Sequence, residues 1–166
     1  ITIETELPEA PIYAYFDSRL IAQSLTNLIK NAVEAFETVN ISESYKPTIA
    51  VQGQLEGNHA RISVSDNGRG WPKDNRQRLL EPYMTTREKG TGLGLAIVAK
   101  IIEQHGGLVE LVDAEPDANG RVGACVTFTL PLTSPQKTST DGEIGDLTDA
   151  MIAQMEEPLL AAVVRK

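Results

Sequence analysis

Two neighbouring segments of the chain alternate apolar and polar residues, which is the period of a β-strand with one covered face. The apolar positions on one side of residues 48–55 are Ile49, Val51 and Leu55. The dipeptide Gly57-Asn58 follows and predicts a hairpin turn before the second segment, residues 59–66. We therefore expect an antiparallel pair of strands with one face packed and the other in water.

The second segment ends on a carboxylate. Its apolar row is Ala60, Ile62 and Val64, and Asp66 occupies the next position of that row. A carboxylate on a core-facing row must find hydrogen-bond partners, because its burial without them costs free energy. The chain then breaks into Asn67-Gly68-Arg69-Gly70, and an Asp before Asn-Gly is also a common turn former.

Two other segments have the apolar spacing of α-helices. The first runs from Ser18 to about Thr38, with Asp17 as its N-cap. Its polar residues Gln23, Asn27 and Asn31 lie four apart, so they stack along one edge. The second helix, Leu93 to His105, ends at a Gly-Gly pair.

The remaining elements are short. Residues 77–80 predict a short helix, and residues 2–7, 12–16, 108–112 and 122–130 predict strands. Five residues of the last strand are in phase: Val122, Ala124, Val126, Phe128 and Leu130. One-sided alternation favours an α/β (α+β) two-layer sandwich, with a mixed, mainly antiparallel sheet of about five strands and about three helices on one face.

The composition changes near the C-terminus. We expect one domain over residues 1–132, followed by a linker and an amphipathic helix within residues 133–166. The helix is marked by Ile144, Leu147, Met151, Met155 and Leu159. Docking on the domain, assembly and disorder remain three open interpretations of this tail.

Charge and cysteine content narrow the function classes. The formal net charge of −8 argues against a nucleic-acid surface, which needs clustered basic residues. The single Cys125 excludes a disulfide framework. The apolar run Leu159–Val164 is too short to span a bilayer, and the pattern of a signal peptide is not expected in this sequence. The first residue is Ile1 rather than Met, so we expect a fragment of a longer protein.

A glycine-rich loop precedes the second helix. Gly90, Gly92 and Gly94 alternate with other residues and lead directly into it. Glycine lets the backbone approach a ligand, and a helix N-terminus attracts anions, so this segment predicts a phosphate seat. It lacks the Lys-Ser/Thr pair of a P-loop and the glycine spacing of the dinucleotide fingerprint.

Three elements together resemble the GHKL ATP-binding superfamily, most closely the catalytic domain of sensor histidine kinases. Leu25-Thr26-Asn27-Leu28-Ile29-Lys30-Asn31-Ala32-Val33-Glu34-Ala35 resembles its N box, and Asp66-Asn67-Gly68-Arg69-Gly70 its G1 box. Residues 81–87 and 90–96 resemble its F and G2 boxes. The likeness covers residues 1–132 and implies the Bergerat fold. The sequence of residues 81–96 resembles that of nitrogen-regulation sensor kinases of the NtrY and NtrB type.

The resemblance implies ATP and Mg²⁺ as cofactors, and roles that agree with the residue chemistry. Asp66 would accept a hydrogen bond from the adenine 6-amino group, and Gly68 and Gly70 would let the backbone approach the base. Asn31 would bind Mg²⁺ through its amide oxygen, and Asn27 would contact the metal–phosphate group. Hydrolytic relatives carry a Glu at the Asn27 position, whereas an amide cannot act as a general base.

The same resemblance gives the phosphate end of the site. Residues 84–91 would form a mobile lid that nucleotide orders, with Arg87 assisting catalysis. Arg87 and Lys89 are equally well explained as solvated loop charges. The nucleotide-contacting set from this region is Tyr83, Thr86, Arg87, Lys89, Gly90, Thr91, Gly92, Leu93 and Gly94.

The sequence departs from the family pattern at three positions. Tyr83 replaces the usual Phe, and Glu34 stands where some kinases carry a basic phosphate contact. Ala124 stands where many members carry a Thr that supports the base, and Cys125 or Thr127 nearby are candidates to replace it.

The accepting histidine is expected elsewhere. His59 follows a turn and His105 lies in the last turn of a helix, where a cation suits the helix dipole, so both are interpreted as structural. The resemblance therefore implies a missing histidine-bearing dimerisation domain and a response regulator as partners. We expect a homodimeric parent, with this part monomeric and cytoplasmic, and the sequence is compatible with a parent that is anchored in the inner membrane and with one that is not. A hydrolysing GHKL-type ATPase and a non-catalytic nucleotide-sensing module are the alternative functions.

Overall fold

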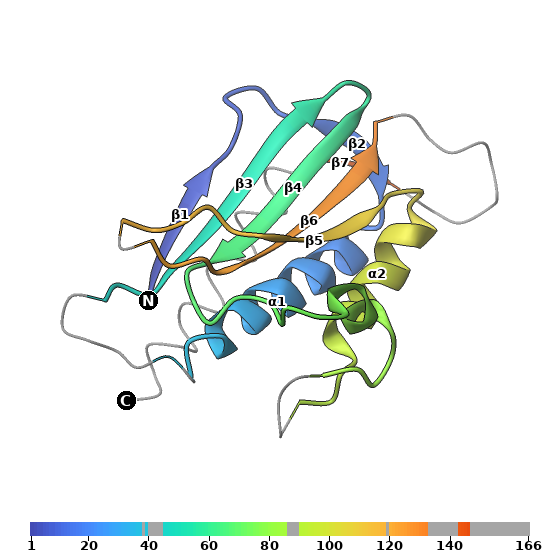
Figure 1. Ribbon diagram of the computed structural model, residues 1–166. Coiled ribbons are helices and arrows are strands. Elements are labelled where there is room, and N and C mark those ends of the chain that lie inside the picture. The colour runs from blue at the N-terminus through green and yellow to red at the C-terminus, as the bar shows by residue number, and fades with distance from the viewer. Residues whose placement is uncertain (38, 40–44, 86–89, 119, 133–142, 147–166) are drawn as a thin grey trace.

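The computed structural model describes residues 1–37, 39, 45–85, 90–118, 120–132 and 143–146. Its main sheet has five strands in the order β1-β3-β4-β6-β5 (Figure 1). They are β1 (Thr2–Glu6), β3 (Thr48–Glu56), β4 (His59–Asp66), β6 (Ala124–Pro131) and β5 (Val109–Asp113). The β1–β3 pair is parallel and the other three pairs are antiparallel, which confirms the mixed sheet predicted from the sequence.

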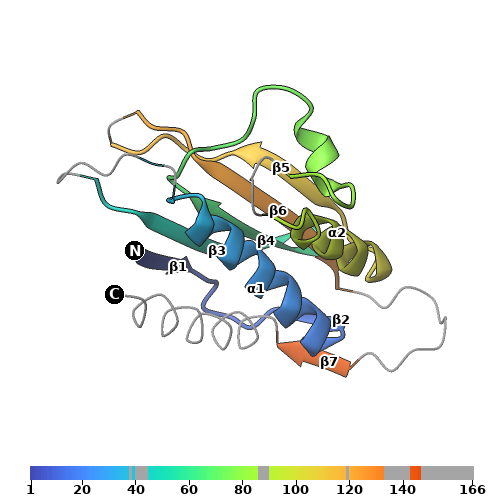
Figure 2. The ribbon, with the colours of Figure 1, turned by 90° about the horizontal axis from the view of Figure 1, so that it is seen from below.

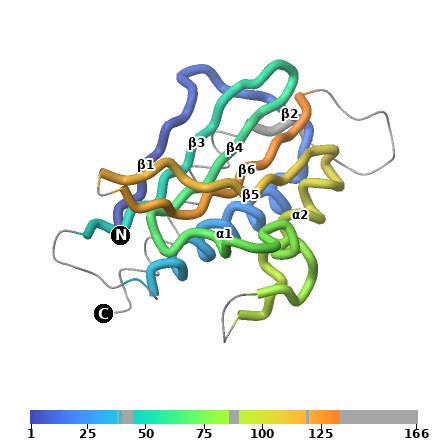
Figure 3. Tube along the Cα trace, viewed as in Figure 1, coloured from blue at the N-terminus to red at the C-terminus, as the bar shows by residue number. Residues whose placement is uncertain are grey.

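The helices cover one face of this sheet (Figures 1 and 2). They are α1 (Ser18–Glu34) and α2 (Gly94–Gln104), with a short 3₁₀ helix, η1 (Arg76–Leu80), beside α2. The chain reaches η1 from the end of β4 by a long connection that Figure 3 traces. The two-layer sandwich is therefore confirmed, with two α-helices and one 3₁₀ helix among the described residues.

The core lies between the two layers. Apolar side chains of α1 and α2 meet the inward rows of β3, β4 and β6. Among the most deeply buried are Leu25, Ile29, Ile49, Val98, Ile102, Phe128 and Leu130. Full burial of one such side chain stabilises the fold by about 1.5–3 kcal/mol. Because side chains alternate along a strand, these rows determine which face of the sheet each later residue of the strand points to.

The predicted alternation fails at two residues. Leu55 is 59% exposed, because β1 pairs with β3 only as far as Gln52 and leaves the end of β3 without a neighbour on that side. Val122 is also exposed, since β6 begins two residues later at Ala124. Helix α1 ends at Glu34 and continues as a turn, four residues before the predicted end.

A two-stranded sheet lies outside the main one. Strand β2 (Tyr13–Phe16) pairs antiparallel with β7 (Glu143–Asp146). The amphipathic helix predicted from Ile144 is therefore wrong at that residue, because the edge of β2 offers backbone hydrogen bonds that outweigh the local apolar spacing. The rest of that predicted helix lies outside the described residues, and the domain boundary at 132 stays a prediction. No helix among the described residues has the length and apolar character to cross a bilayer.

His105 joins the two helices. Its Nε2 accepts a hydrogen bond from the backbone N–H of Asp17 at 3.0 Å, and its Nδ1 lies 2.7 Å from the carbonyl of Ile101. An acceptor at Nε2 requires the neutral ring with the proton on Nδ1. The structural role predicted for this residue agrees with these contacts, but the ring acts as an acceptor for the N-cap of α1 rather than as a cation at the dipole of α2.

This contact predicts a stability effect. His105→Ala should lower the free energy of unfolding by about 1–3 kcal/mol, because it leaves the partly buried N–H of Asp17 without its acceptor. Urea denaturation followed by circular dichroism measures the change. His59→Ala, at an exposed position, is the matched control and should have little effect. Equal losses of unfolding free energy in the two variants would contradict a stabilising role for the hydrogen bond between His105 and Asp17.

Candidate functional site

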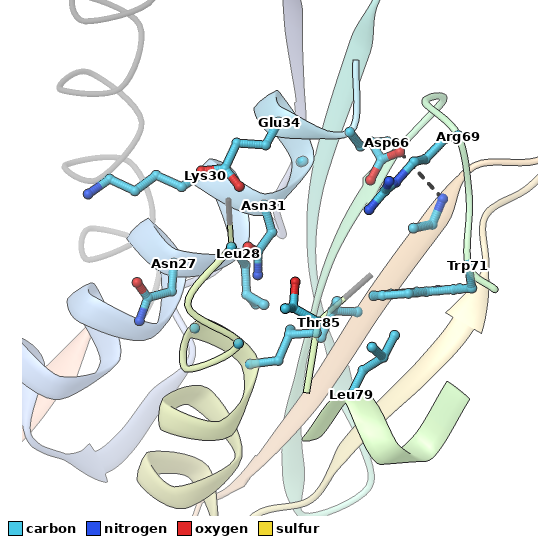
Figure 4. Close-up of a pocket in the computed structure, with 18 of the residues that line it drawn as sticks. Asn27, Leu28, Lys30, Asn31, Glu34, Asp66, Arg69, Trp71, Leu79 and Thr85 are labelled. Carbon is cyan, nitrogen blue, oxygen red and sulfur yellow. Dashed lines mark hydrogen bonds between the residues drawn. The ribbon is translucent and has the colours of Figure 1, made fainter. Parts of the chain in front are cut away.

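One cavity of about 880 Å³ opens between α1, the inner face of β4 and β6, and the loops before η1 and α2. Figure 4 shows Asn27 and Asn31 along α1, with Asp66 and Trp71 across the cavity. The three segments that resemble the N, G1 and G2 boxes thus line the same cavity. Its wall includes these residues from the boxes: Asn27, Asn31, Asp66, Gly70, Gly90, Thr91, Gly92 and Gly94.

Asp66 is a buried residue in the wall of this cavity. It is 7% exposed, and its Oδ1 accepts hydrogen bonds from the backbone N–H of Gly68 at 2.8 Å and of Ala124 at 3.5 Å. The position at the end of the buried row of β4 therefore has the partners that its burial requires. Donors on one carboxylate oxygen hold the group while the residue still lines the cavity.

The glycines of this turn are required by space. A Cβ added at Gly68 would lie 2.9 Å from both the Cβ of Ala35 and the Oδ1 of Asp66. Gly70 has φ +71° and faces the carbonyl oxygen of Val122, 2.9 Å from an added Cβ. Gly70 lines the cavity, whereas Gly68 packs behind Asp66 against the end of α1. Both therefore shape the turn that presents the carboxylate.

An apolar wall adjoins Asp66. Trp71 lines the cavity, and its indole N–H donates to the carbonyl of Val112 at 2.6 Å. Leu79 from η1 and Met84 also line it. Sequence reasoning missed Trp71 and Leu79, although the place of Trp71 directly after Gly70 was an available signal. A flat cavity wall beside a carboxylate suits a planar, hydrogen-bonding base.

Ala124, at the position where many family members carry a threonine, lies at the start of β6. Ala124 and Val126 line the cavity, so Cys125 and Thr127 point to the other face of the sheet. The Sγ of Cys125 lies 3.7 Å from the Oγ1 of Thr127, and burial raises the pKa of the Cys125 thiol. Neither side chain replaces the missing threonine, and the backbone N–H of Ala124 is what reaches Asp66.

The polar edge of α1 lines the other end of the cavity. The Nδ2 of Asn27 is buried, and among the described residues it has no hydrogen-bond partner. One turn on, the Asn31 amide packs against Gly94, where an added Cβ would lie 3.6 Å from Nδ2. A buried donor that the protein does not satisfy favours a ligand acceptor at this end.

The N-terminus of α2 lies at the same end. Gly94 is its first residue, and the preceding Leu93 makes no side-chain cap hydrogen bond. Gly92 has φ +66°, and its carbonyl accepts from the N–H of Tyr83 at 3.0 Å, which leaves no room for a Cβ. The N–H groups of a first helical turn have no partner within the helix, and beside the amides of Asn27 and Asn31 they form a seat for an anion.

The structure does not bring every predicted residue into the cavity. The side chain of Tyr83 is 77% exposed and does not line it, nor does Leu93. Thr86, Arg87 and Lys89 lie outside the described residues. Lys30, Glu34 and Arg69 do line it, so charges of both signs surround the opening.

The donor set fits a nucleotide with a hard cation. The described residues hold no cluster of three or more His, Cys, Asp or Glu side chains that would bind a metal alone. The amide oxygen of Asn31 is a ligand type that Mg²⁺ accepts, and such sites are commonly completed by phosphate oxygens and water. A triphosphate would also supply acceptors for Asn27 and for the first turn of α2.

Comparison with known proteins agrees with this arrangement. Nitrogen regulation protein NtrY of Azorhizobium caulinodans is 48% identical over 141 residues, which is 85% of this chain but only 18% of NtrY. The catalytic domain of histidine kinase ThkA matches with a TM-score of 0.64 and 28% identity, covering 80% of this chain and 79% of that one. Full-length ShkA in complex with AMPPNP matches with a TM-score of 0.63 and 28% identity, covering 81% of this chain and 26% of ShkA.

The chain thus spans less than a fifth of the length of NtrY. A family model described as histidine kinase-, DNA gyrase B- and HSP90-like ATPase matches residues 16–134. That range contains the two helices, the G1 turn and the whole cavity. The chain belongs to the family of histidine kinase-, DNA gyrase B- and HSP90-like ATPases.

Proposed function

We propose that this chain is the ATP-binding catalytic domain of a sensor histidine kinase of the nitrogen-regulation type. It binds Mg-ATP and donates the γ-phosphate to a histidine on another domain. The observation that carries the proposal is the polarity of the cavity, with a buried carboxylate at one end and amides with a helix N-terminus at the other. A nucleoside triphosphate has the matching order of groups, from base to phosphate.

Binding follows from this polarity. The adenine 6-amino group donates to Asp66, and the base lies against Trp71. The phosphates accept from the first turn of α2 and from the buried Nδ2 of Asn27. Asn31 holds the Mg²⁺ that neutralises charge on the phosphates. Arg87 and Lys89 would supply positive charge to the terminal phosphates.

The chemical step needs little from the domain beyond positioning. An imidazole nitrogen of the incoming histidine forms the new N–P bond, the bond from the γ-phosphorus to the bridging oxygen breaks, and ADP leaves with that electron pair. Since Asn27 is an amide, it cannot remove a proton from water as a general base. This favours transfer to a side chain over hydrolysis, although the cavity also has Glu34 at its rim.

The implied partners are a histidine-bearing dimerisation domain and a response regulator, with this domain in the cytoplasm. Mixing the 166-residue chain with the separately produced histidine-bearing domain of its parent and [γ-³²P]ATP tests the function. The expected result is label on the histidine, lost in acid and retained in base. Release of labelled phosphate to water without labelled protein would favour the ATPase. Nucleotide binding with neither reaction would favour the sensing module.

The base assignment predicts a large effect at Asp66. Asp66→Asn should weaken ATP binding by roughly 2–5 kcal/mol, because it removes one partner of a buried charged hydrogen bond. The only tryptophan of the chain, Trp71, lines the cavity, so its fluorescence reports binding directly. Exposed Asp74→Asn is the control and should bind ATP as the parent chain does. Unchanged affinity in Asp66→Asn, with a folded domain, would remove Asp66 from the base site.

The metal assignment predicts an effect that depends on Mg²⁺. Asn31→Ala should reduce ATP affinity strongly with Mg²⁺ and only weakly in EDTA, since the lost group is a metal ligand. Gln23→Ala, two turns earlier on the same edge of α1, is the matched control. Calorimetric titrations with and without Mg²⁺ separate the cases, and equal losses in both would mean that Asn31 only supports the fold.

A further inference from the structure

Asn67, the residue after Asp66, makes hydrogen bonds through its backbone and its side chain to the segment that leads into β3. The backbone N–H of Asn67 donates to the carbonyl of Thr48 at 3.2 Å, and its Oδ1 accepts from the N–H of Thr48 at 2.8 Å. Its Nδ2 donates to the carbonyl of Lys46 at 2.9 Å. The remaining backbone acceptor, the carbonyl of Asn67, takes the hydroxyl of Tyr45 at 2.9 Å. The position of the Asp66–Asn67 turn thus depends on residues 45–48.

Among residues 45–48, only Tyr45 uses its side chain to bond Asn67. This side chain is also buried, with 6% exposure. Its ring meets Phe36, just beyond the end of α1, edge to face at a centroid distance of 6.4 Å. The guanidinium of Arg121 lies over the ring, with its Cζ 4.1 Å from the centroid. A cation over a desolvated aromatic face stabilises the pair and fixes the ring. Tyr45 therefore links the end of α1, the start of β3 and the loop before β6.

Arg121 is itself held in that loop. Its backbone N–H donates to the Oδ1 of Asp117 at 2.9 Å, and its carbonyl accepts from the N–H of Asp117 at 2.9 Å. Two residues later, Gly123 passes so close to the backbone oxygen of Asp66 that no Cβ fits between them. The same loop thus presses on the Asp66 turn from one side and on the Tyr45 ring from another.

The hydroxyl of Tyr45 acts as a donor. Burial raises the pKa of Tyr45, and the hydrogen bond and positive charge of Arg121 partly oppose this. The net direction is upward, so the phenol keeps its proton near neutral pH and the hydrogen bond to Asn67 is maintained. A phenylalanine at this position would keep the ring and the cation contact and remove only the hydroxyl, with its hydrogen bonds to Asn67 and Arg121. Of these two bonds, the one to Asn67 reaches the Asp66 turn directly.

We propose that Tyr45, clamped by Arg121, is a positioning residue for base recognition, which holds the Asp66 carboxylate at the distance that the adenine 6-amino group requires. This rests on the proposed function, since it assumes that Asp66 binds the base. Tyr45 does not line the cavity, so it acts through the Asp66–Asn67 turn. Its loss should affect the amino-group contact and spare the phosphate contacts at the other end.

The test compares ATP with purine riboside triphosphate, which is the same nucleotide without the 6-amino group. Tyr45→Phe should weaken ATP binding about fivefold, as expected for one lost hydrogen bond, and weaken the analogue less than twofold. Arg121→Gln should have the same pattern as Tyr45→Phe, with a larger loss of affinity for ATP than for the analogue. Tyr13→Phe, at an exposed tyrosine, is the matched control and should change neither. Trp71 fluorescence gives the affinities, and thermal unfolding without nucleotide confirms that each variant folds.

The outcomes separate this inference from the proposed function. Equal losses for both nucleotides, or no loss for either, would contradict a positioning role for Tyr45. If Tyr45→Phe does not fold, the same comparison in Arg121→Gln decides the matter. Asp66→Asn is measured in parallel: if it weakens the binding of both nucleotides equally, the base assignment itself is wrong. If it weakens ATP more than the analogue and the Tyr45 and Arg121 variants do not, only the present inference is wrong.

Discussion

The burial of one carboxylate constrains the structure around it. Asp66 lies on the core-facing row of β4, where an unsatisfied charge would cost several kcal/mol. Its partners are backbone N–H groups of Gly68 and Ala124, so both the following turn and the start of β6 must approach closely. Those approaches leave space for glycine only at Gly68 and Gly123. A charged residue at the end of a strand thus determines the shape of two segments.

The phosphate end of the site includes a buried donor that the described part of the protein does not satisfy. The Nδ2 of Asn27 is buried without a hydrogen-bond partner among the described residues, and α2 begins without a side-chain cap. Unsatisfied groups of this kind reduce stability in the empty domain and become favourable when an anion binds. The cavity therefore has one end where protein hydrogen bonds fix the orientation of a carboxylate, and another end where a buried donor of Asn27 gains a partner when phosphate binds.

Local sequence information was sufficient wherever one element decides the outcome. The parity of Ala60, Ile62 and Val64 placed Asp66 correctly on the inner face, and the spacing of Asn27 and Asn31 placed both on one edge of α1. It failed where neighbours decide. Leu55 lost its cover because β1 is short, and Ile144 joined a strand because β2 has an open edge.

Individual side-chain contacts between distant segments could not be predicted from the local pattern. Tyr45 and Arg121 are 76 positions apart in the numbering, and no periodicity relates them, yet the cation lies on the ring. Trp71 stands inside the predicted motif region, but its orientation depends on a hydrogen bond to β5. Such residues refine a site whose main parts follow from the local pattern.

The central claim is that one cavity binds ATP with its base at Asp66 and its phosphates at the start of α2. A crystal structure of this chain with Mg²⁺ and a non-hydrolysable ATP analogue tests it most directly. The account predicts the 6-amino nitrogen within hydrogen-bond distance of the Asp66 carboxylate, the metal on the amide oxygen of Asn31, and phosphate oxygens on N–H groups of the first turn of α2. A nucleotide bound in the reverse direction, or at another surface, would contradict it.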